Sequence, residues 1–303
     1  MAVIECVPNV SEGRRAEVID ACAEAIRAAG PALLDVSADA DHHRTVFTFA
    51  GSPEAVRAGA LALFDAALPR IDLRRHRGVH PRLGAVDVVP FVPLEDATMA
   101  DCVAIAREVA ATVAARHALP VFLYEAAAAT PERRRLEGIR RGGFERLAAR
   151  LGDPAWTPDF GPARPHATAG ASVVGARPVL IAYNITLATD RLAVAKAVAA
   201  AVRESSGGLP HVKAMGVPLA GRGLVQVSMN LTRHRATTLH AVMARVVEEA
   251  ARRGVEVHDS EIIGLAPADA LWPSAAADLR IDPARLDERV LERRLGGRLI
   301  GGV

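Results

Sequence analysis

The chain has 303 residues, of which 50% are hydrophobic and 24% are charged, and its formal net charge is +2. This length is enough for one large domain or two smaller domains with real cores, and the apolar content excludes disorder for most of the chain. The nearly balanced charge gives no electrostatic footprint for binding nucleic acid.

The first half of the chain has the pattern of a β-α-β-β-α-β unit. Short apolar runs predict strands at residues 3–7, 32–36, 45–49 and 86–92. Apolar residues at helical spacing predict helices at residues 13–29 and 53–68. We expect Ser11 to cap the first helix, and Ser52 with Pro53 to open the second. A helix at 99–117 and a strand at 120–124 extend this unit.

The second half repeats this order of elements. Strands are predicted at residues 179–185, 212–217, 224–229 and 255–263, and helices at 191–203 and 236–252. Two such units indicate an α/β (α+β) protein with two ferredoxin-like βαββαβ subdomains, each with its helices on one face of a sheet. We expect an N-terminal subdomain at 1–177 and a C-terminal subdomain at 178–303, with a ligand cleft between them.

Residues 151–178 separate the two units and are rich in Pro and Gly. Four prolines between residues 154 and 165 argue against regular structure there, so the segment reads as a linker. Trp156 and Phe160 nevertheless ought to pack, because a linker has no need of large aromatic side chains.

The cysteines, the N-terminal sequence and the apolar stretches indicate the cellular compartment of the protein. Cys6, Cys22 and Cys102 are odd in number and have no paired spacing, which favours reduced thiols and the cytoplasm. The N-terminus lacks the basic region and apolar run of a signal peptide. Uninterrupted apolar stretches of about 18 residues are also lacking, so no transmembrane helix is expected.

The loop before the strand at 86–92 carries the strongest functional signal. Pro81 biases His80 toward extended or turn geometry, and Gly78 and Gly84 free the backbone on either side. A histidine is thereby held at a strand end, where catalytic residues are often found, and its ordinary pKa suits proton transfer near neutral pH.

Two other interpretations of His80 remain open at this stage. The side chain could be an ordinary surface histidine in a turn. It could also bind a metal together with His76, four residues earlier, but Gly78 and Pro81 disfavour a helix through both, and no further ligand stands at recognisable spacing. We therefore predict no metal site.

The residues from His80 to Phe91 resemble the His-Pro-Arg-x-Gly-Ala-x-Asp-Val-x-Pro-Phe signature of glutamate formiminotransferases. Further segments match this family in order, up to about residue 270. They are residues 5–13, 33–36, 44–49, 156–162, 175–177, 182–185, 226–231 and 260–265. Many ordered motifs at compatible spacing are more specific than one short pattern.

The resemblance implies transfer of the formimino group of N-formimino-L-glutamate to N5 of tetrahydrofolate, the co-substrate, in histidine degradation. In that reaction one histidine can accept the N5 proton as general base and return it to the departing glutamate nitrogen as general acid. We predict that His80 has this role. Two alternatives stay open: a glutamate formyltransferase acting on N-formylglutamate, and a folate-binding module without catalysis.

Both substrates carry carboxylates, for which cationic partners are needed. Arg44, Arg82, Arg177 and Lys213 lie in or beside the matching motifs, and each could equally be a solvated surface charge. The resemblance also implies folate binding by the segment that contains Gly161, Pro162 and Gly170.

Several polar residues near turns have two interpretations each. Asp39 and Asp41 could orient His80 or hold the pterin, or they could cap a turn. Asn9 is the better functional candidate at its turn, because a cap needs only one residue there. Asn184 and Asn230 end predicted strands and could line a cleft or serve turns.

The resemblance implies a homodimer and small-molecule substrates, without a membrane or nucleic acid partner. Because the chain ends at Val303, we expect the cyclodeaminase of the bifunctional relatives to be a separate enzyme. After residue 283 the sequence has room for one helix, which would close near Gly296.

Overall fold

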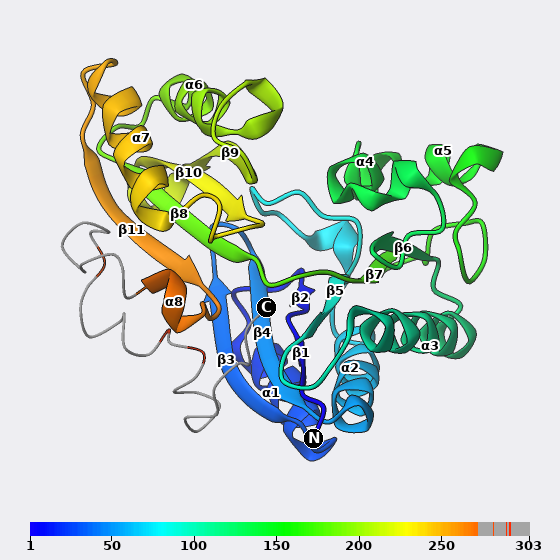
Figure 1. Ribbon diagram of the computed structural model, residues 1–303. Helices are drawn as coiled ribbons and strands as arrows, with labels where there is room; N and C mark the ends of the chain where they lie inside the picture. Colours follow the sequence, from blue (N-terminus) through cyan, green and yellow to red (C-terminus); the bar gives the residue numbers. More distant parts are fainter. Residues whose placement is uncertain (272–280, 282–288, 290, 292–303) are drawn as a thin grey trace. The chain divides into compact units, whose positions relative to one another are not determined.

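The computed structural model describes residues 1–271, 281, 289 and 291, and the helix expected after residue 283 lies outside them (Figure 1). The chain divides into two compact units between Pro178 and Val179. Within the described residues, no helix combines the length and apolar character needed to cross a membrane.

The first unit contains a seven-stranded sheet. Its strands are β1 (Ile4–Cys6), β2 (Asn9–Val10), β3 (Ala32–Asp39), β4 (Arg44–Gly51), β5 (Val86–Pro93), β6 (Val121–Glu125) and β7 (Ser172–Ala176). Both β1 and β2 pair with β4 and β5, so they act as one interrupted strand. The order across the sheet is therefore β3, β4, β1 with β2, β5, β7 and β6.

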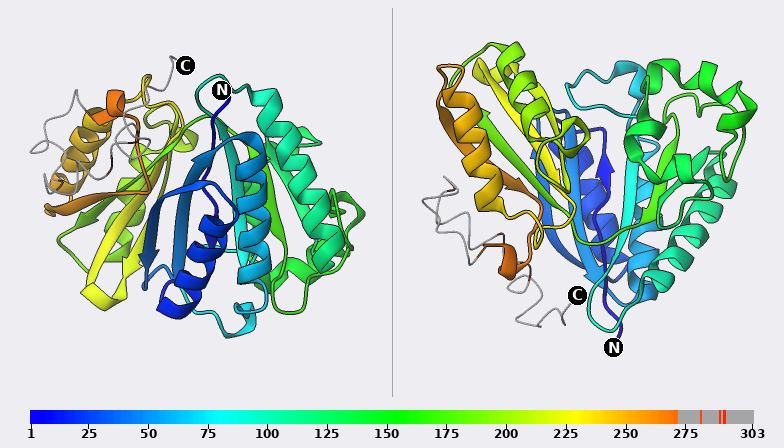
Figure 2. Two further views of the ribbon diagram at one scale, coloured as in Figure 1. Left: turned by 90° about the horizontal axis from the view of Figure 1, so that it is seen from below. Right: turned by 45° about the horizontal axis from the view of Figure 1, so that its top comes forward.

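Three long helices cover one face of this sheet, where they lie side by side (Figure 2). They are α1 (Ala16–Ala28), α2 (Pro53–Ala67) and α3 (Met99–His117). Each buries an apolar stripe at helical spacing against the strands, as Val18, Cys22 and Ile26 do in α1. Ser52 accepts a hydrogen bond from the Ala55 N–H and so caps α2, as predicted.

The predicted cap of α1 is wrong. The Ser11 hydroxyl instead donates to the carbonyl of Gly84 at 2.8 Å. The helix begins at Ala16, too far along the chain for Ser11 to reach its first N–H groups. The longer side chain of Glu12 folds back and accepts the N–H groups of Gly13, Arg14 and Arg15 through Oε1.

The linker interpretation of residues 151–178 is also wrong in part. β7 lies inside this segment and pairs in parallel with both β5 and β6. Four of the prolines precede residue 172 and Pro178 follows β7, which itself is a fully buried, β-type run without proline. The aromatic residues do pack: Trp156 meets the Phe122 ring edge-on, and Phe160 packs against the core. Two short helices, α4 (Leu136–Arg140) and α5 (Leu147–Leu151), precede them.

The second unit has the ferredoxin-like order. Its elements are β8 (Ile181–Leu187), α6 (Leu192–Val202), β9 (Val212–Leu219), β10 (Leu224–Leu231), α7 (Leu239–Ala251) and β11 (Val257–Ile263), followed by α8 (Ala268–Leu271). The antiparallel sheet has the order β11, β8, β10, β9. Both units thus contain a βαββαβ core, which confirms the α/β class predicted from the sequence.

Candidate functional site

His80 lies in the loop between α2 and β5, and the carboxylate of Asp87 holds the end of that loop. Asp87 Oδ1 accepts the N–H of Leu83 at 2.7 Å and that of Gly84 at 3.1 Å. The side chain of Asp87 is fully buried. Because two N–H groups bind one buried carboxylate, the backbone after His80 has a defined position relative to β5.

The other oxygen of Asp87 faces Asn9 and Arg140. Asn9 Nδ2 donates to it at 3.5 Å, and the Arg140 guanidinium forms an ion pair with it. The predicted residue Asn9 therefore lies beside the loop. Sequence reasoning missed Asp87 and Arg140 as site residues, although a lone carboxylate in an apolar strand was a signal for Asp87. Arg140 lies 53 residues from Asp87 along the chain, and no sequence pattern indicated that the two residues would meet.

The turn between β3 and β4 brings further polar side chains to His80. The rings of His42 and His80 stack with their centroids 5.9 Å apart. Asp39 Oδ1 accepts the N–H of His42 at 2.6 Å, and Asp39 stands opposite Arg44 across β3 and β4. The positive charge of Arg44 acts on His80. Two predicted residues, Asp39 and Arg44, are thus brought together with His80.

Burial and positive neighbours keep the imidazole of His80 neutral. Burial lowers the pKa of His80 well below its ordinary value, and Arg44, Arg140 and His42 lower it further. Burial, together with Arg140, also lowers the pKa of Arg44 to about 10, against the opposing effect of nearby carboxylates. At neutral pH a neutral imidazole able to accept a proton therefore lies within the electrostatic reach of a guanidinium cation.

Arg82 follows His80 in the loop and forms an ion pair with Glu145 at 2.7 Å. The Arg82 side chain is 14% exposed, whereas that of Glu145 is 62% exposed. Arg82 Nε is buried and has no hydrogen-bond partner within the described structure. The guanidinium therefore keeps a donor that its ion pair does not use.

Of the three predicted folate-segment residues, Gly170 lies against the His80 loop. Its φ is +69°, and a Cβ there would stand 2.2 Å from the carbonyl oxygen of Leu83. Gly161 and Pro162 lie elsewhere, because a Cβ on Gly161 would meet the carbonyl of Leu119, just before β6. Since β7 separates β5 from β6, Gly161 stands two strands away from the loop.

Arg177 is not brought to His80. Its N–H donates to the carbonyl of Phe91, near the far end of β5 from the loop, and its guanidinium donates to Pro178. The charge of Arg177 acts on Glu5 and on Tyr124. Burial raises the pKa of Glu5 to about 7, although Arg177 opposes this shift.

In the second unit, Asn184 belongs to a row of polar side chains on the sheet face opposite α6 and α7. Tyr183 and Ile185 point into the core with those helices, so Asn184 between them points to the other face. Asn184 Nδ2 and Gln226 Nε2 both donate to Glu261 Oε1, at 3.3 and 3.1 Å. Alternating polar residues in β8, β10 and β11 were a signal for this row that the sequence analysis did not use.

Lys213 and Asn230 belong to the same sheet, where they pair across β9 and β10. Asn230 is exposed, and Lys213 is half-buried. The neighbouring residues Val212 and Leu231 face the helical core, so Lys213 and Asn230 lie on the polar face.

Comparison with known proteins identifies both units. Residues 3–177 match the family model of the N-terminal subdomain of the formiminotransferase domain, and residues 182–284 match the formiminotransferase domain. The chain belongs to the formiminotransferase family. The resemblance predicted from the sequence motifs is confirmed.

Two relatives of this formiminotransferase-family chain match over nearly their whole length. A glutamate formimidoyltransferase of Streptococcus pyogenes is 42% identical over 97% of this chain and 99% of its own. The glutamate formimidoyltransferase of Thermoplasma acidophilum is 42% identical over 97% of this chain and 98% of its own length. The formimidoyltransferase-cyclodeaminase of Rattus norvegicus is 42% identical over 90% of this chain and 52% of its own length. The chain therefore spans about half of that bifunctional relative.

The side chains around His80 in this formiminotransferase-family protein suit proton transfer and anion binding. The neutral imidazole of His80 lies within the electrostatic reach of the Arg44 cation, and Arg82, two residues after His80, retains an unused N–H donor. Within residues 1–271 and the three further described positions, no group of three or more His, Cys, Asp or Glu side chains could hold a metal ion.

Proposed function

We propose that the protein is a glutamate formimidoyltransferase. It transfers the formimino group of N-formimino-L-glutamate to N5 of tetrahydrofolate, which gives 5-formiminotetrahydrofolate and L-glutamate. Two glutamate formimidoyltransferases that match this chain nearly end to end support the assignment. The observation that carries the mechanism is the neutral, partly buried imidazole of His80, which stacks on His42 and lies within the electrostatic reach of Arg44.

The chemistry requires one proton to move twice. A bond forms between N5 and the formimino carbon as N5 loses its proton, and neutral His80 accepts that proton as general base. The bond from the same carbon to the glutamate nitrogen then breaks, and protonated His80 returns the proton to that nitrogen. Because burial and Arg44 disfavour the imidazolium, His80 is a ready donor in the second step.

The substrate carboxylates need cationic partners, and we assign them to Arg44 and Arg82. Both guanidiniums carry a buried Nε that has no hydrogen-bond partner in the described part of the chain. Asn9 and Asp39 act as positioning residues in this scheme, because Asn9 donates to Asp87 and Asp39 holds His42. Gly170 lets the folate segment approach the loop closely. Roles for Gly161, Pro162, Arg177, Asn184 and Lys213 in substrate binding stay predictions.

The reaction is proposed for the cytoplasm, since Cys6, Cys22 and Cys102 are all buried free thiols. A separate cyclodeaminase would process the product, as the bifunctional relatives carry both names in one chain. The homodimer expected from the resemblance stays a prediction.

A turnover assay with two donors tests the proposal. Purified protein is incubated with tetrahydrofolate and either formiminoglutamate or formylglutamate, and substituted folate is followed by absorbance. We expect turnover with formiminoglutamate. Preference for formylglutamate would instead indicate a formyltransferase, and folate binding without turnover would indicate a non-catalytic module.

Substitution of His80 tests the mechanism separately. We expect His80→Ala to lower kcat by about 10² to 10⁴, the usual contribution of general acid–base catalysis, while tetrahydrofolate still binds. His117→Ala is a matched control, because His117 lies at the end of α3 and bonds to Asp65. Full turnover by His80→Ala would contradict the assigned role.

A further inference from the structure

His43 has a backbone conformation that residues with a Cβ rarely adopt. Its φ is +51°, in the left-handed region, and it ends the turn between β3 and β4. This conformation is unfavourable for a non-glycine residue, so it persists only where surrounding contacts hold it, and such places are often functional. His43 has no part in the reaction as assigned above.

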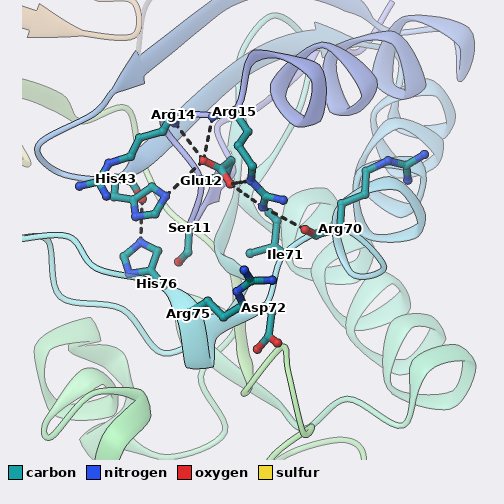
Figure 3. Close-up of a pocket in the computed structure, with 10 residues that line it drawn as sticks. All are labelled: Ser11, Glu12, Arg14, Arg15, His43, Arg70, Ile71, Asp72, Arg75 and His76. Carbon is teal, nitrogen blue, oxygen red and sulfur yellow. Dashed lines mark hydrogen bonds and ion pairs between the residues drawn. The ribbon is translucent and has the colours of Figure 1, made fainter.

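Two hydrogen bonds and a ring contact join His43 to the segment that leads to His80. His43 Nδ1 lies 3.0 Å from the carbonyl oxygen of Arg77. The carbonyl oxygen of His43 lies 2.8 Å from His76 Nε2, and the two imidazole rings stack with their centroids 4.2 Å apart (Figure 3). Because His76 and Arg77 closely precede His80 in the chain, these contacts fix the start of its loop.

The turn and this segment also touch through their backbones. A Cβ on Gly78 would collide with the carbonyl of His42, and the N–H of Val79 donates to the carbonyl of Asp41 at 3.2 Å. The ring of His42 in turn stacks on that of His80. The position of His80 therefore depends on the position of the turn.

Both ring nitrogens of His43 face atoms that can only accept a hydrogen bond. Nδ1 faces the Arg77 carbonyl, and Nε2 lies 3.2 Å from Glu12 Oε1. Burial would raise the pKa of Glu12, but the N–H groups of Arg14 and Arg15 and the Arg15 guanidinium lower it to about 2, so this carboxylate is ionised. A neutral imidazole has one N–H and satisfies one of these acceptors, whereas an imidazolium satisfies both. The side chains of His43 and Glu12 are 13% and 2% exposed, so the bond between them is shielded from water.

The charged groups around His43 have both signs. Burial lowers the pKa of His76 to about 4, so the ring stacked on His43 carries no charge near neutral pH. Glu12, the carboxylate that bonds to the ring, favours the imidazolium, and neighbouring arginines oppose it. The other charged residues on the packed segments are Arg14 and Arg15 before α1, Arg77 and Arg82 in the loop before β5, and Asp39, Asp41 and Arg44 at the turn itself.

We propose that His43 is a positioning residue for His80 and acts as an imidazolium. With two N–H groups it bonds at once to Glu12, before α1, and to the carbonyl of Arg77, and it thereby fixes the loop that carries His80. Loss of its proton gives up one of these bonds and loosens the loop. The effect of His43 on turnover rests on the proposed function, whereas its effect on the loop does not.

Limited proteolysis of the full chain tests the positioning without folate. Trypsin cleaves after arginine, and Arg75 and Arg77 are exposed residues of the segment that His43 holds. Cleavage there requires local opening, so His43→Asn should speed it about tenfold or more, the usual effect of losing a charge-assisted hydrogen bond. Asparagine tolerates the left-handed region, so the backbone conformation is retained while the ring is lost.

Two references separate this local effect from general instability. Cleavage at arginines elsewhere in the chain rises as well if the whole fold is weakened. His117→Asn is the matched control, because His117 lies at the end of α3 and bonds to Asp65. Equal cleavage after Arg75 and Arg77 in wild type and His43→Asn would overturn the proposal.

The pH dependence distinguishes an imidazolium from a ring that only fills space. From about pH 5.5 to about pH 8 the wild-type segment should lose protection relative to His43→Asn, since the bonds of the protonated ring are present at low pH and are lost as it deprotonates. Taking the ratio of the two cleavage rates at each pH cancels the pH dependence of trypsin and of His42. Glu12 stays ionised throughout this range, because its pKa is about 2. A constant ratio would refute the role of the imidazolium.

Turnover measurements connect the loop with the reaction. With formiminoglutamate as donor, His43→Asn should lower kcat by about tenfold to a hundredfold, because it displaces His80, while the Kd of tetrahydrofolate changes little. An unchanged kcat would overturn the link between His43 and His80. An inactive wild-type protein would instead contradict the proposed function, and the proteolysis result would still decide whether His43 holds the loop.

Discussion

Substitution of Asp87 by Asn should destabilise the first unit strongly. Asp87 is fully buried, accepts two backbone N–H groups from Leu83 and Gly84, and forms an ion pair with Arg140. An asparagine can still accept the two N–H groups through its carbonyl oxygen. Its amide group, however, would face Arg140 without a negative charge, so the change isolates the ion pair.

The expected loss follows from the burial of the pair. Removing one partner of a buried ion pair costs about 3–5 kcal/mol, because the remaining charge is left uncompensated. The side chain of Arg140 is 14% exposed and gains some hydration, so we expect a value near the lower end of that range, about 3 kcal/mol. At about 2–4 °C per kcal/mol, Tm should fall by about 6–12 °C.

Thermal unfolding followed by circular dichroism measures this loss, and urea unfolding gives the free energy. Asp65→Asn is the matched control, because Asp65 pairs with Arg116 and His117 at a site where it is 46% exposed. Exposed pairs contribute less than about 1 kcal/mol. Equal losses in the two variants, or a loss below about 1 kcal/mol for Asp87→Asn, would refute the reasoning.

Three further predictions concern pH and packing. Arg44→Met removes a cation that lowers the pKa of His80, so the acid limb of kcat/KM should move to higher pH; an unmoved limb would contradict the assigned proximity. Glu5→Gln should stabilise the protein above pH 7 by up to about 3 kcal/mol, since the pKa of Glu5 is raised from 4.5 to about 7 in the folded state. That advantage should disappear below pH 4.5, and a pH-independent difference in urea unfolding would argue against it. Gly84→Ala should cost about 1–3 kcal/mol, because its Cβ would stand 2.2 Å from the carbonyl of Ala171; thermal unfolding reports this, with Gly138→Ala, where the nearest atom is 3.5 Å away, as the control.

Local patterns predicted much of the fold. The helix expected at 53–68 is α2 at Pro53–Ala67, because a capping serine and a proline define its start and an apolar stripe defines its buried face. β7 was not predicted, because the prolines nearby favoured the interpretation of the whole segment as a linker. Ser11 was misjudged because α1 starts several residues later than the apolar pattern suggested.

Site residues that belong to one sequence motif or one turn were predicted. Site residues that come from distant segments of the chain were missed. Asp39 and Arg44 flank one turn, so their proximity follows from a hairpin. The partners of Asp87 and Arg82, namely Arg140 and Glu145, come from the segment after β6. No local periodicity indicates such contacts, because they depend on where β6 and β7 place the segment between them.

The position of β7 between β5 and β6 bears on the order in which the first unit folds. β6 precedes β7 in the chain, yet within the described residues it joins the sheet only through β7. During synthesis, β6 must therefore wait about fifty residues for β7, although Asp159 and Phe160 can bond to its other edge earlier. Val88 likewise meets its partner Val173 only then. Such non-local pairing slows folding and leaves a strand edge exposed in the folding intermediate. Chains that stop before residue 172 should therefore aggregate rather than form a smaller sheet.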